Sequence, residues 1–162
     1  MLKANFVLDA IGTKYHAGAM ARELVLSDPA AIERNGDRRR EWVARGGGMP
    51  FPADEPNFRR IDALLYEAMQ YTAIEVKVSR SDFLRETPEK RWPWQQITNR
   101  FVYATPKGLL KPEEIPSECG LWEVDEFGKV SVAKRAKITA AKPIPNQLFV
   151  ALMYRHNQRG TR

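Results

Sequence analysis

Two carboxylates and one ammonium group are spaced so that the fold could bring them together. Asp62 lies in one short apolar segment, and Glu75 and Lys77 lie in the next. Apolar and polar residues alternate in both segments, which is typical of half-buried strands. If residues 67–70 form a hairpin loop, Asp62 lies opposite Glu75, and Lys77 points to the same face. Carboxylates this close repel each other unless a cation lies between them, so the pattern indicates a cation site.

An ordinary hairpin would explain the same three residues. Glu-x-Lys is common on the solvated face of an amphipathic strand, and Lys77 could form a simple salt bridge to Glu75 or Asp62. The residues that follow help to distinguish the two interpretations. Ser79 and Asp82 form a Ser-x-x-Asp signal for the start of a helix. The strand that carries Glu-x-Lys therefore leads into a helix.

The ordered set of motifs resembles the PD-(D/E)XK nuclease superfamily, and most of all the MmcB-like DNA repair family. The resemblance covers about residues 58–135. The matching features are Arg60 and Asp62, Glu75 and Lys77, Ser79 with Asp82 and Phe83, Arg91 to Pro93, and Phe101 to Pro106. The chain departs from the pattern at Ile61, where the superfamily has a nominal proline, and carries about two extra residues between Phe83 and the Trp-Pro pair.

The resemblance implies an α/β fold with a restriction-endonuclease-like core. In that core a mixed central sheet of about five strands is flanked by helices. It also implies a metal-dependent deoxyribonuclease that hydrolyses phosphodiester bonds in DNA repair or recombination. The alternative is a DNA-binding module of the same fold that does not cleave DNA. Bound metal would separate the two functions.

The site residues follow from the same resemblance. Asp62, Glu75 and Lys77 are the expected catalytic residues, and Asp62, Glu75 and the backbone carbonyl of Val76 are the expected metal ligands. Mg²⁺ or Mn²⁺ fits this set because both ions prefer oxygen ligands. Lys77 would orient the attacking water or stabilise charge on phosphorus. The first helix of such folds often supplies another acidic ligand, for which Glu23 is the candidate.

Cations and aromatic residues alternate just before the strand that begins near Phe101. This composition suits phosphate contacts and stacking on unpaired bases. The candidate DNA-binding residues here are Lys90, Arg91, Trp92, Gln95 and Gln96. Two alternatives stay open, because the glutamines could lie on a solvated helix face and the tryptophans could belong to the core or its rim.

The charge distribution points to a polyanionic partner. The net charge is +6, yet eight basic residues and no acidic ones follow Glu126. Such a basic end suits DNA, although a solubilising tail would look the same. Lys134, Arg135 and Lys137 are the expected phosphate contacts. The sequence leaves open whether the chain also forms a homodimer.

The length of 162 residues predicts a single nuclease-like domain. Its expected parts are a helical N-terminal part with a Gly/Pro loop (1–57), a catalytic core (58–142) and a C-terminal basic helix (143–162). Cys119 is the one cysteine, and no apolar run could span a bilayer. Both observations favour a cytoplasmic protein without a membrane partner.

The expected elements outside the site are mostly helices. Helical spacing predicts a helix over 14–26 and either one helix or two short ones over 30–45, because Asn35-Gly36 is a turn signal; a glycine-rich loop follows. A short helix is expected near Trp94 to Thr98. A hairpin is expected around the turn 125–128, and a final helix from Asn146.

Overall fold

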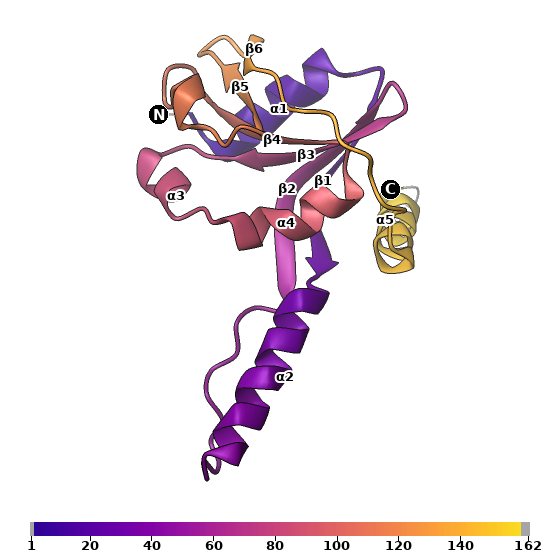
Figure 1. Cartoon of the computed structure of the whole chain (residues 1–162). Helices are drawn as coiled ribbons and strands as arrows, with labels where there is room; N and C mark the ends of the chain where they lie inside the picture. The colour runs from indigo at the N-terminus through magenta and orange to yellow at the C-terminus, as the bar shows by residue number, and fades with distance from the viewer. Residues whose placement is uncertain (1, 160–162) are drawn as a thin grey trace.

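The computed structural model describes residues 2–159 of the chain, with side chains described through Tyr154. Helices and strands are mixed along the chain, as an α/β protein requires (Figure 1). The elements are α1 (Ala4–Lys14), β1 (Ala19–Ser27), α2 (Pro29–Ala44), β2 (Phe58–Glu67), β3 (Gln70–Val76), α3 (Arg80–Leu84), α4 (Pro88–Ile97), β4 (Arg100–Pro106), a short 3₁₀ helix (Pro112–Glu114), β5 (Gly120–Val124), β6 (Val130–Lys134) and α5 (Asn146–Arg159).

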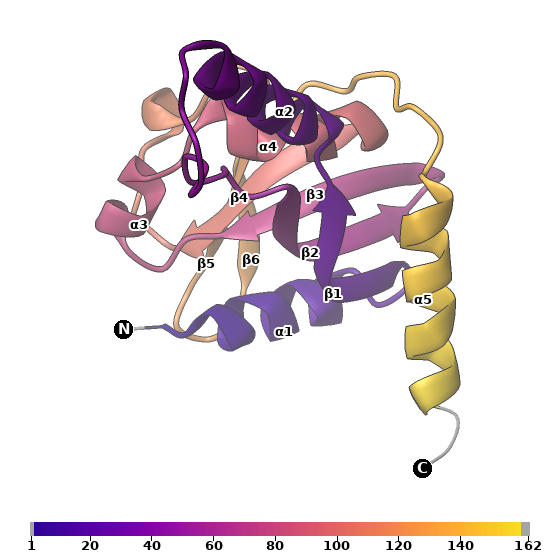
Figure 2. The same cartoon turned by 90° about the horizontal axis from the view of Figure 1, so that it is seen from below.

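All six strands form one mixed sheet, in the order in which they occur in the sequence. β3, β4 and β5 run parallel to one another, whereas the β1–β2, β2–β3 and β5–β6 pairs are antiparallel. α1 and α4 lie on opposite faces of the sheet, and α5 packs beside β1 (Figure 2). The α/β class is confirmed, with one strand more than the sequence predicted.

A separate apolar layer fills each face of the sheet. Val7 and Ile11 of α1 are one helical turn apart, and both are buried against one face, where they share a cluster with Ile74. On the other face, Trp94 of α4 is fully buried in a cluster that includes Leu64. The sheet is therefore covered on both sides at its centre, as expected for parallel strands.

The prediction for the N-terminal part was wrong in one respect. Residues 14–26 do not form a helix, because α1 ends at Lys14 and β1 begins at Ala19. Met20 and Leu24 fit helical spacing, but Leu24 and Leu26 are buried while Val25 between them is exposed, which is the period of a strand. Part of the segment 1–57 thus belongs to the sheet.

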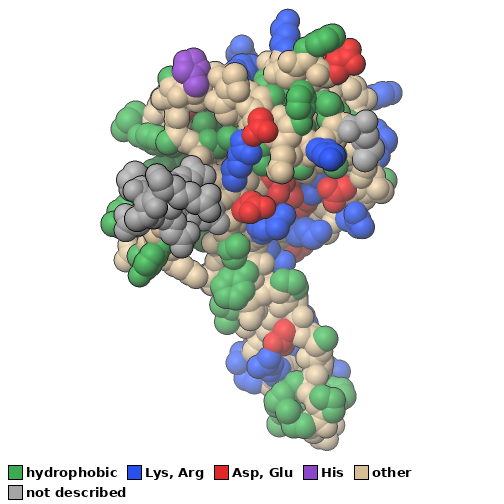
Figure 3. Space-filling view, turned by 180° about the vertical axis from the view of Figure 1, so that it is seen from behind, with side chains coloured by type: hydrophobic (Ala, Val, Ile, Leu, Met, Phe, Trp, Pro, Cys, Tyr) green, Lys and Arg blue, Asp and Glu red, His purple; other side chains and the backbone are tan. Residues whose placement is uncertain are grey.

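α2 and the segment that returns from it form an arm that projects from the body (Figure 1). Asp28 caps the helix by accepting from the Ala31 N–H at 3.1 Å, and proline at the first position favours this start. Polar contacts hold the returning segment to α2, including Arg34 Nε to Glu55 Oε1 at 2.6 Å. Exposed hydrophobic side chains gather at the arm's far tip (Figure 3).

The β2–β3 hairpin has the predicted register. Tyr66 pairs with Tyr71, as expected, but Glu67 also pairs with Gln70, so only Ala68 and Met69 remain in the turn. Both turn residues have positive φ, 49° at Ala68 and 62° at Met69. This is the left-handed conformation that two-residue hairpins require and that Asn-Gly adopts at least cost. The turn therefore stores backbone strain, of about 1–2 kcal/mol per residue.

Replacing Ala68 and Met69 with Asn and Gly is expected to relieve that strain. A gain of about 1–2 kcal/mol corresponds to an increase in Tm of roughly 2–8 °C for a chain of this size. Differential scanning calorimetry measures the change. Ala68→Val is the opposite control, because a β-branched residue resists positive φ and should lower Tm. An Asn-Gly variant no more stable than the wild type would show that the turn carries no such strain.

Several other elements lie where the sequence placed them. β4 covers Arg100–Pro106, β5 and β6 form the hairpin around residues 125–128, and α5 begins at Asn146. α4 begins earlier than predicted, at Pro88, because Pro88 favours the first position of a helix. Among residues 2–159, no helix combines the length and hydrophobicity that crossing a bilayer demands.

Candidate active site

The candidate site lies where β2 and β3 part. Their recorded pairing ends at Ala63 with Ile74, one residue before Asp62 on one strand and Glu75 on the other. Beyond this point the Asp62 side chain takes over the hydrogen bonding, because its Oδ2 accepts from the Val76 N–H at 2.8 Å. Asp62 and Glu75 therefore lie at the same level of the sheet, as the register predicts.

Lys77 joins these carboxylates from the end of β3. Its Nζ lies 2.9 Å from Glu75 Oε1 and 2.7 Å from Glu86 Oε2, and its side chain is only 7% exposed. The Lys77 N–H donates to the Ala104 carbonyl of β4 at 3.0 Å, which fixes the backbone. Glu75 and Lys77 line an open pocket of about 220 Å³, together with Lys90 of α4.

Burial and neighbouring charges shift the pKa values of these groups. Burial, and then the nearby Asp62 charge, raise the pKa of Glu75 from 4.5 to about 7. Burial also raises the pKa of Asp62, against the opposing effect of its hydrogen bond from Val76. Burial alone would lower the pKa of Lys77, but Glu75 and Glu86 outweigh it and the pKa is raised. Lys77 therefore stays a cation at neutral pH and is not suited to remove a proton.

The raised pKa of Glu75 predicts that the metal-free protein loses folding stability as the pH rises. Below the unfolded-state pKa of 4.5, Glu75 is protonated in both the folded and the unfolded protein, so its charge costs no folding stability. As the pH rises through about 7, keeping Glu75 buried costs folding stability, because the unfolded chain ionises this group more readily. Glu75→Gln removes the charge, so in EDTA it should raise the stability at pH 8 by about 1–3 kcal/mol, with little change at pH 4.5. Calorimetry at both pH values tests this. Glu41→Gln, on the exposed face of α2, should show no such difference; an E75Q effect equal at both pH values would refute the assignment.

The donor set suits a hard divalent cation. Asp62 Oδ2 is occupied by the Val76 N–H, while Asp62 Oδ1 lies 3.7 Å from Arg60 Nη2. In a strand the N–H and C=O of one residue point to the same side, so the Val76 carbonyl also faces Asp62. Two carboxylates and one carbonyl match the few protein oxygens that Mg²⁺ or Mn²⁺ takes beside water and phosphate. Within residues 2–159, no group of three or more His, Cys, Asp or Glu side chains is arranged around one metal position.

Glu23 lies on a strand and not on the predicted helix. Arg22 pairs with Ala63 and Leu24 with Ile61, so the register places Glu23 across from Asp62 on the neighbouring strand. Its φ of 52° interrupts the regular strand at this level, and its side chain is exposed. The predicted element was wrong, although the residue lies beside the site. A role as a metal ligand stays a prediction.

Glu86 was missed by the sequence analysis. It follows α3 by two residues, and its side chain is only 8% exposed where it meets Lys77. No motif marks an acidic residue at this spacing, so only the path of the chain after α3 reveals it. Ser79 is confirmed as the N-cap of α3, because its Oγ accepts from the Asp82 N–H at 3.2 Å. Asp82 Oδ2 also approaches Lys77 Nζ, at 3.9 Å.

The candidate DNA-binding residues on α4 divide among different surroundings. Lys90 lines the pocket of Glu75 and Lys77. Arg91 is buried, and its Nη2 lies 3.4 Å from Glu118 Oε1, so it is no free surface cation. Trp92 is 47% exposed. Trp94, by contrast, is fully buried and belongs to the core.

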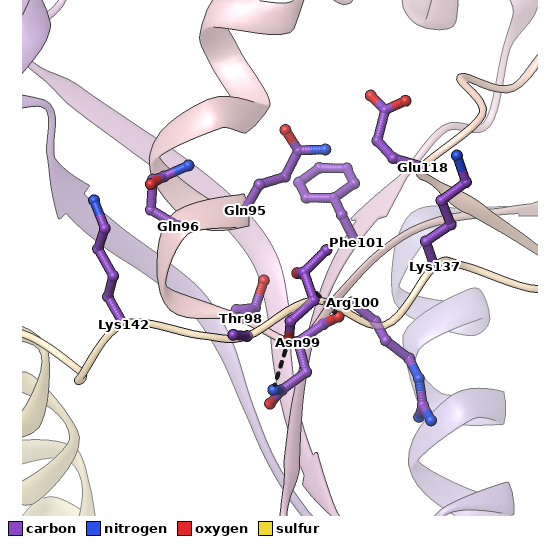
Figure 4. Close-up of a pocket in the computed structure, with 11 residues that line it drawn as sticks. Gln95, Gln96, Thr98, Asn99, Arg100, Phe101, Glu118, Lys137 and Lys142 are labelled. Atoms are coloured by element: carbon purple, nitrogen blue, oxygen red, sulfur yellow. Dashed lines mark hydrogen bonds between the residues drawn. The ribbon is translucent and has the colours of Figure 1, made fainter.

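A second pocket, of about 270 Å³, brings several of the other candidates together. Gln95 and Gln96 face it from α4, and Lys137 and Lys142 face it from the segment after β6 (Figure 4). That segment is tied across the end of α4, because the Lys142 N–H donates to the Gln96 carbonyl at 2.8 Å. The polar lining suits an anion better than an apolar ligand.

The basic end does not act as one surface. Lys134 Nζ donates to the carbonyls of Ile115 and Pro116, at 2.6 and 3.2 Å, so it already has a structural role. Arg135 and Lys137 are exposed, as a phosphate contact requires. Arg155 and Arg159 belong to α5, but their side chains lie outside the described residues, as does Arg162 entirely.

No protein-family model matches this chain, and no curated protein matches it. Among solved structures, it is similar to the SPO1766 protein of unknown function from Silicibacter pomeroyi. The two chains share 22% sequence identity with a TM-score of 0.46, over 82% of this chain and 90% of that chain. A likeness at this level supports no functional argument, so the α/β assignment and the candidate site rest on the structure of this chain.

Proposed function

We propose that this chain is a Mg²⁺- or Mn²⁺-dependent nuclease that hydrolyses phosphodiester bonds of DNA in repair or recombination. The observation that carries the proposal is the meeting of Asp62, Glu75 and Lys77 beside an open pocket at the parted ends of β2 and β3. A buried cation and two carboxylates of raised pKa are unusual at the end of a plain hairpin. The buried free thiol of Cys119 agrees with the cytoplasmic location that is part of the same proposal.

Each residue has a distinct task in this proposal. Asp62, Glu75 and the Val76 carbonyl would hold the metal, which when bound offsets phosphate charge and lowers the pKa of a bound water. Lys77 is held between Glu75 and Glu86, and it remains protonated. It can therefore donate a hydrogen bond to the attacking water or to a phosphate oxygen that gains charge. The fixed ammonium needs little rearrangement at the moment of reaction.

The direct test is cleavage of a DNA panel. Linear duplex, circular, single-stranded and branched DNA are incubated with the chain in Mg²⁺, Mn²⁺ or EDTA. Cleavage is expected with either metal and not with EDTA, and Asp62→Asn should abolish it. Glu41→Gln, an exposed carboxylate on α2, is the matched control and should cleave normally. DNA binding without cleavage of any substrate would instead identify a DNA-binding module of this fold.

The pocket beside α4 predicts a salt-dependent contribution to DNA affinity. If Lys137 and Lys142 contact phosphates, replacing both with Gln should reduce the slope of log affinity against log salt by about 0.7–0.9 per lost contact. The change should be the same for different sequences, because phosphates carry no base information. Fluorescence anisotropy at several salt concentrations measures the slope. Lys129→Gln, exposed at the other end of β6, is the control; an equal slope in all variants would place DNA elsewhere.

A further inference from the structure

A larger pocket, of about 440 Å³, lies between the start of α2 and the exposed side of α4. Its lining consists of Asp28, Ala30, Arg34, Pro88, Glu89, Arg91, Trp92, Gln95 and Glu118. One ion pair connects it with the candidate active site. Arg59 lines the active-site pocket, and Asp28 lines the larger pocket. The distance from Arg59 Nε to Asp28 Oδ2 is 2.8 Å. The two pockets therefore share a wall, and one bound strand could reach both.

Arg91 places a buried guanidinium group at the wall of this pocket. Its side chain is only 9% exposed, and its one recorded ion pair is the 3.4 Å contact from Nη2 to Glu118 Oε1. Arg91 Nε is buried and has no hydrogen-bond partner among the described residues. The Tyr103 hydroxyl, which is also buried, interacts with the Arg91 guanidinium inside the fold, so the unpaired Nε is no sign of a missing ligand. Arg91 therefore contributes a fixed positive charge to the wall of the pocket.

Trp92 gives the pocket an aromatic surface. It is 47% exposed although it lies on a helix whose next tryptophan, Trp94, is fully buried. An exposed indole beside a pocket is a stacking platform for a nucleobase, because every base has a π-face. Pro88 and Ala30 add apolar lining on either side. The pocket thus combines a flat apolar contact with polar groups, as base-binding sites do.

The charges of the lining exclude a simple phosphate site. Three carboxylates line the pocket, those of Asp28, Glu89 and Glu118, against the two guanidinium groups of Arg34 and Arg91. Arg59 neutralises Asp28 from behind the pocket wall, so the lining offers an anion no net positive charge. The edge of a base carries both donors and acceptors, and it can use carboxylates and guanidinium groups together. The lining therefore suits a neutral base better than the backbone of DNA.

We infer that this pocket receives one unpaired nucleobase of the strand whose phosphate lies at Asp62 and Glu75. The inference rests on the proposed nuclease function and specifies its substrate class. A base inside a continuous duplex is stacked and paired, so it cannot enter the pocket without being extruded. Single-stranded DNA, or branched DNA with unpaired nucleotides at the junction, presents such a base at the least cost in free energy. The preferred substrate is therefore DNA with an unpaired segment.

Binding without cleavage tests the pocket separately from the chemistry. Fluorescence anisotropy in EDTA compares a labelled single-stranded oligonucleotide with a blunt duplex of the same sequence. Trp92→Ala should weaken single-strand binding about 5- to 100-fold, and Trp92→Phe should retain most of it, because base stacking contributes on that scale. Duplex binding should not change. Trp42→Ala, an exposed tryptophan at the arm's tip, is the matched control and should bind like the wild type.

An abasic scan locates the base. Removing the base from each nucleotide in turn should weaken wild-type binding strongly at one position, and that loss should disappear in Trp92→Ala. Equal single-strand affinity in the wild type and Trp92→Ala, or no sensitive abasic position, overturns the inference. The cleavage panel is read separately with Mg²⁺. Base binding without cleavage would reject the nuclease and keep the pocket, whereas cleavage without an effect of Trp92 would do the reverse.

Discussion

Glu75→Ala is expected to abolish Mn²⁺ binding and to lower DNA cleavage by more than about 100-fold. Even groups that only orient metal ligands cost about 10- to 100-fold when removed, so a ligand itself should cost more. Glu75 and Asp62 lie at one level of the sheet, and the Asp62 charge contributes to the raised pKa of Glu75. A shared cation is what relieves this repulsion, and with one carboxylate gone its site is incomplete.

Isothermal titration calorimetry with Mn²⁺ at pH 8 measures the binding, since Glu75 must be ionised to hold a metal and its pKa is about 7. Asp62→Asn should give the same result from the opposite strand. Glu86→Gln is the matched control because Glu86 contacts Lys77, and it should keep Mn²⁺ binding. Unchanged Mn²⁺ affinity in Glu75→Ala would falsify the metal assignment.

Lys77→Met is expected to keep Mn²⁺ and DNA binding but to lower cleavage by about 100- to 1,000-fold. This is the usual cost of losing one preorganised donor to a transition state. The Lys77 ammonium lies between the carboxylates of Glu75 and Glu86, so its removal should not take away a group that binds the metal or DNA. A loss of turnover with intact binding is what a group that acts mainly in the transition state predicts.

A second variant is needed to separate a loss of activity from a loss of folded Lys77→Met protein. Losing one member of a buried ion pair costs about 3–5 kcal/mol, since the other charge stays buried and unpaired. The double variant Lys77→Met, Glu86→Gln removes the cation and one of its two carboxylates and leaves Glu75 to hold the metal, so it should keep a higher Tm than Lys77→Met alone while remaining inactive. Glu86→Gln alone should retain cleavage within about 10-fold, because Lys77 keeps its contact with Glu75. Cleavage by the double variant at the wild-type rate would reduce Lys77 to a structural ion pair.

The sequence predicted the register of the β2–β3 hairpin better than it predicted the N-terminal part of the fold, for a local reason. Strand register follows from alternation and from the position of the turn, and both are visible in the residues around Tyr66 and Tyr71. Once that register is set, Asp62 must lie near Glu75, and Lys77 must share a face with it. The motif is therefore encoded within a short stretch of chain.

What the sequence did not predict depends on distant contacts. β1 forms a strand because it pairs with the edge of β2, and the residues between 14 and 26 do not indicate by themselves that this edge is available. Glu86 enters the site because α3 is short and turns the chain back. The pocket beside Trp92 forms between α2 and α4, more than 40 residues apart, and neither helix alone indicates it.

The strained turn at Ala68 and Met69 has a practical use for work on the site. Both residues lie at the far end of the hairpin from Glu75, so relaxing them with Asn and Gly leaves the chemistry untouched. The gain of about 1–2 kcal/mol in folding stability would offset part of the stability that site variants lose with their buried charge pairs. A protein with that turn would serve as the parent for the Lys77 and Glu75 series. Differences in activity could then be separated from differences in the amount of folded enzyme, since additivity holds for sites this far apart.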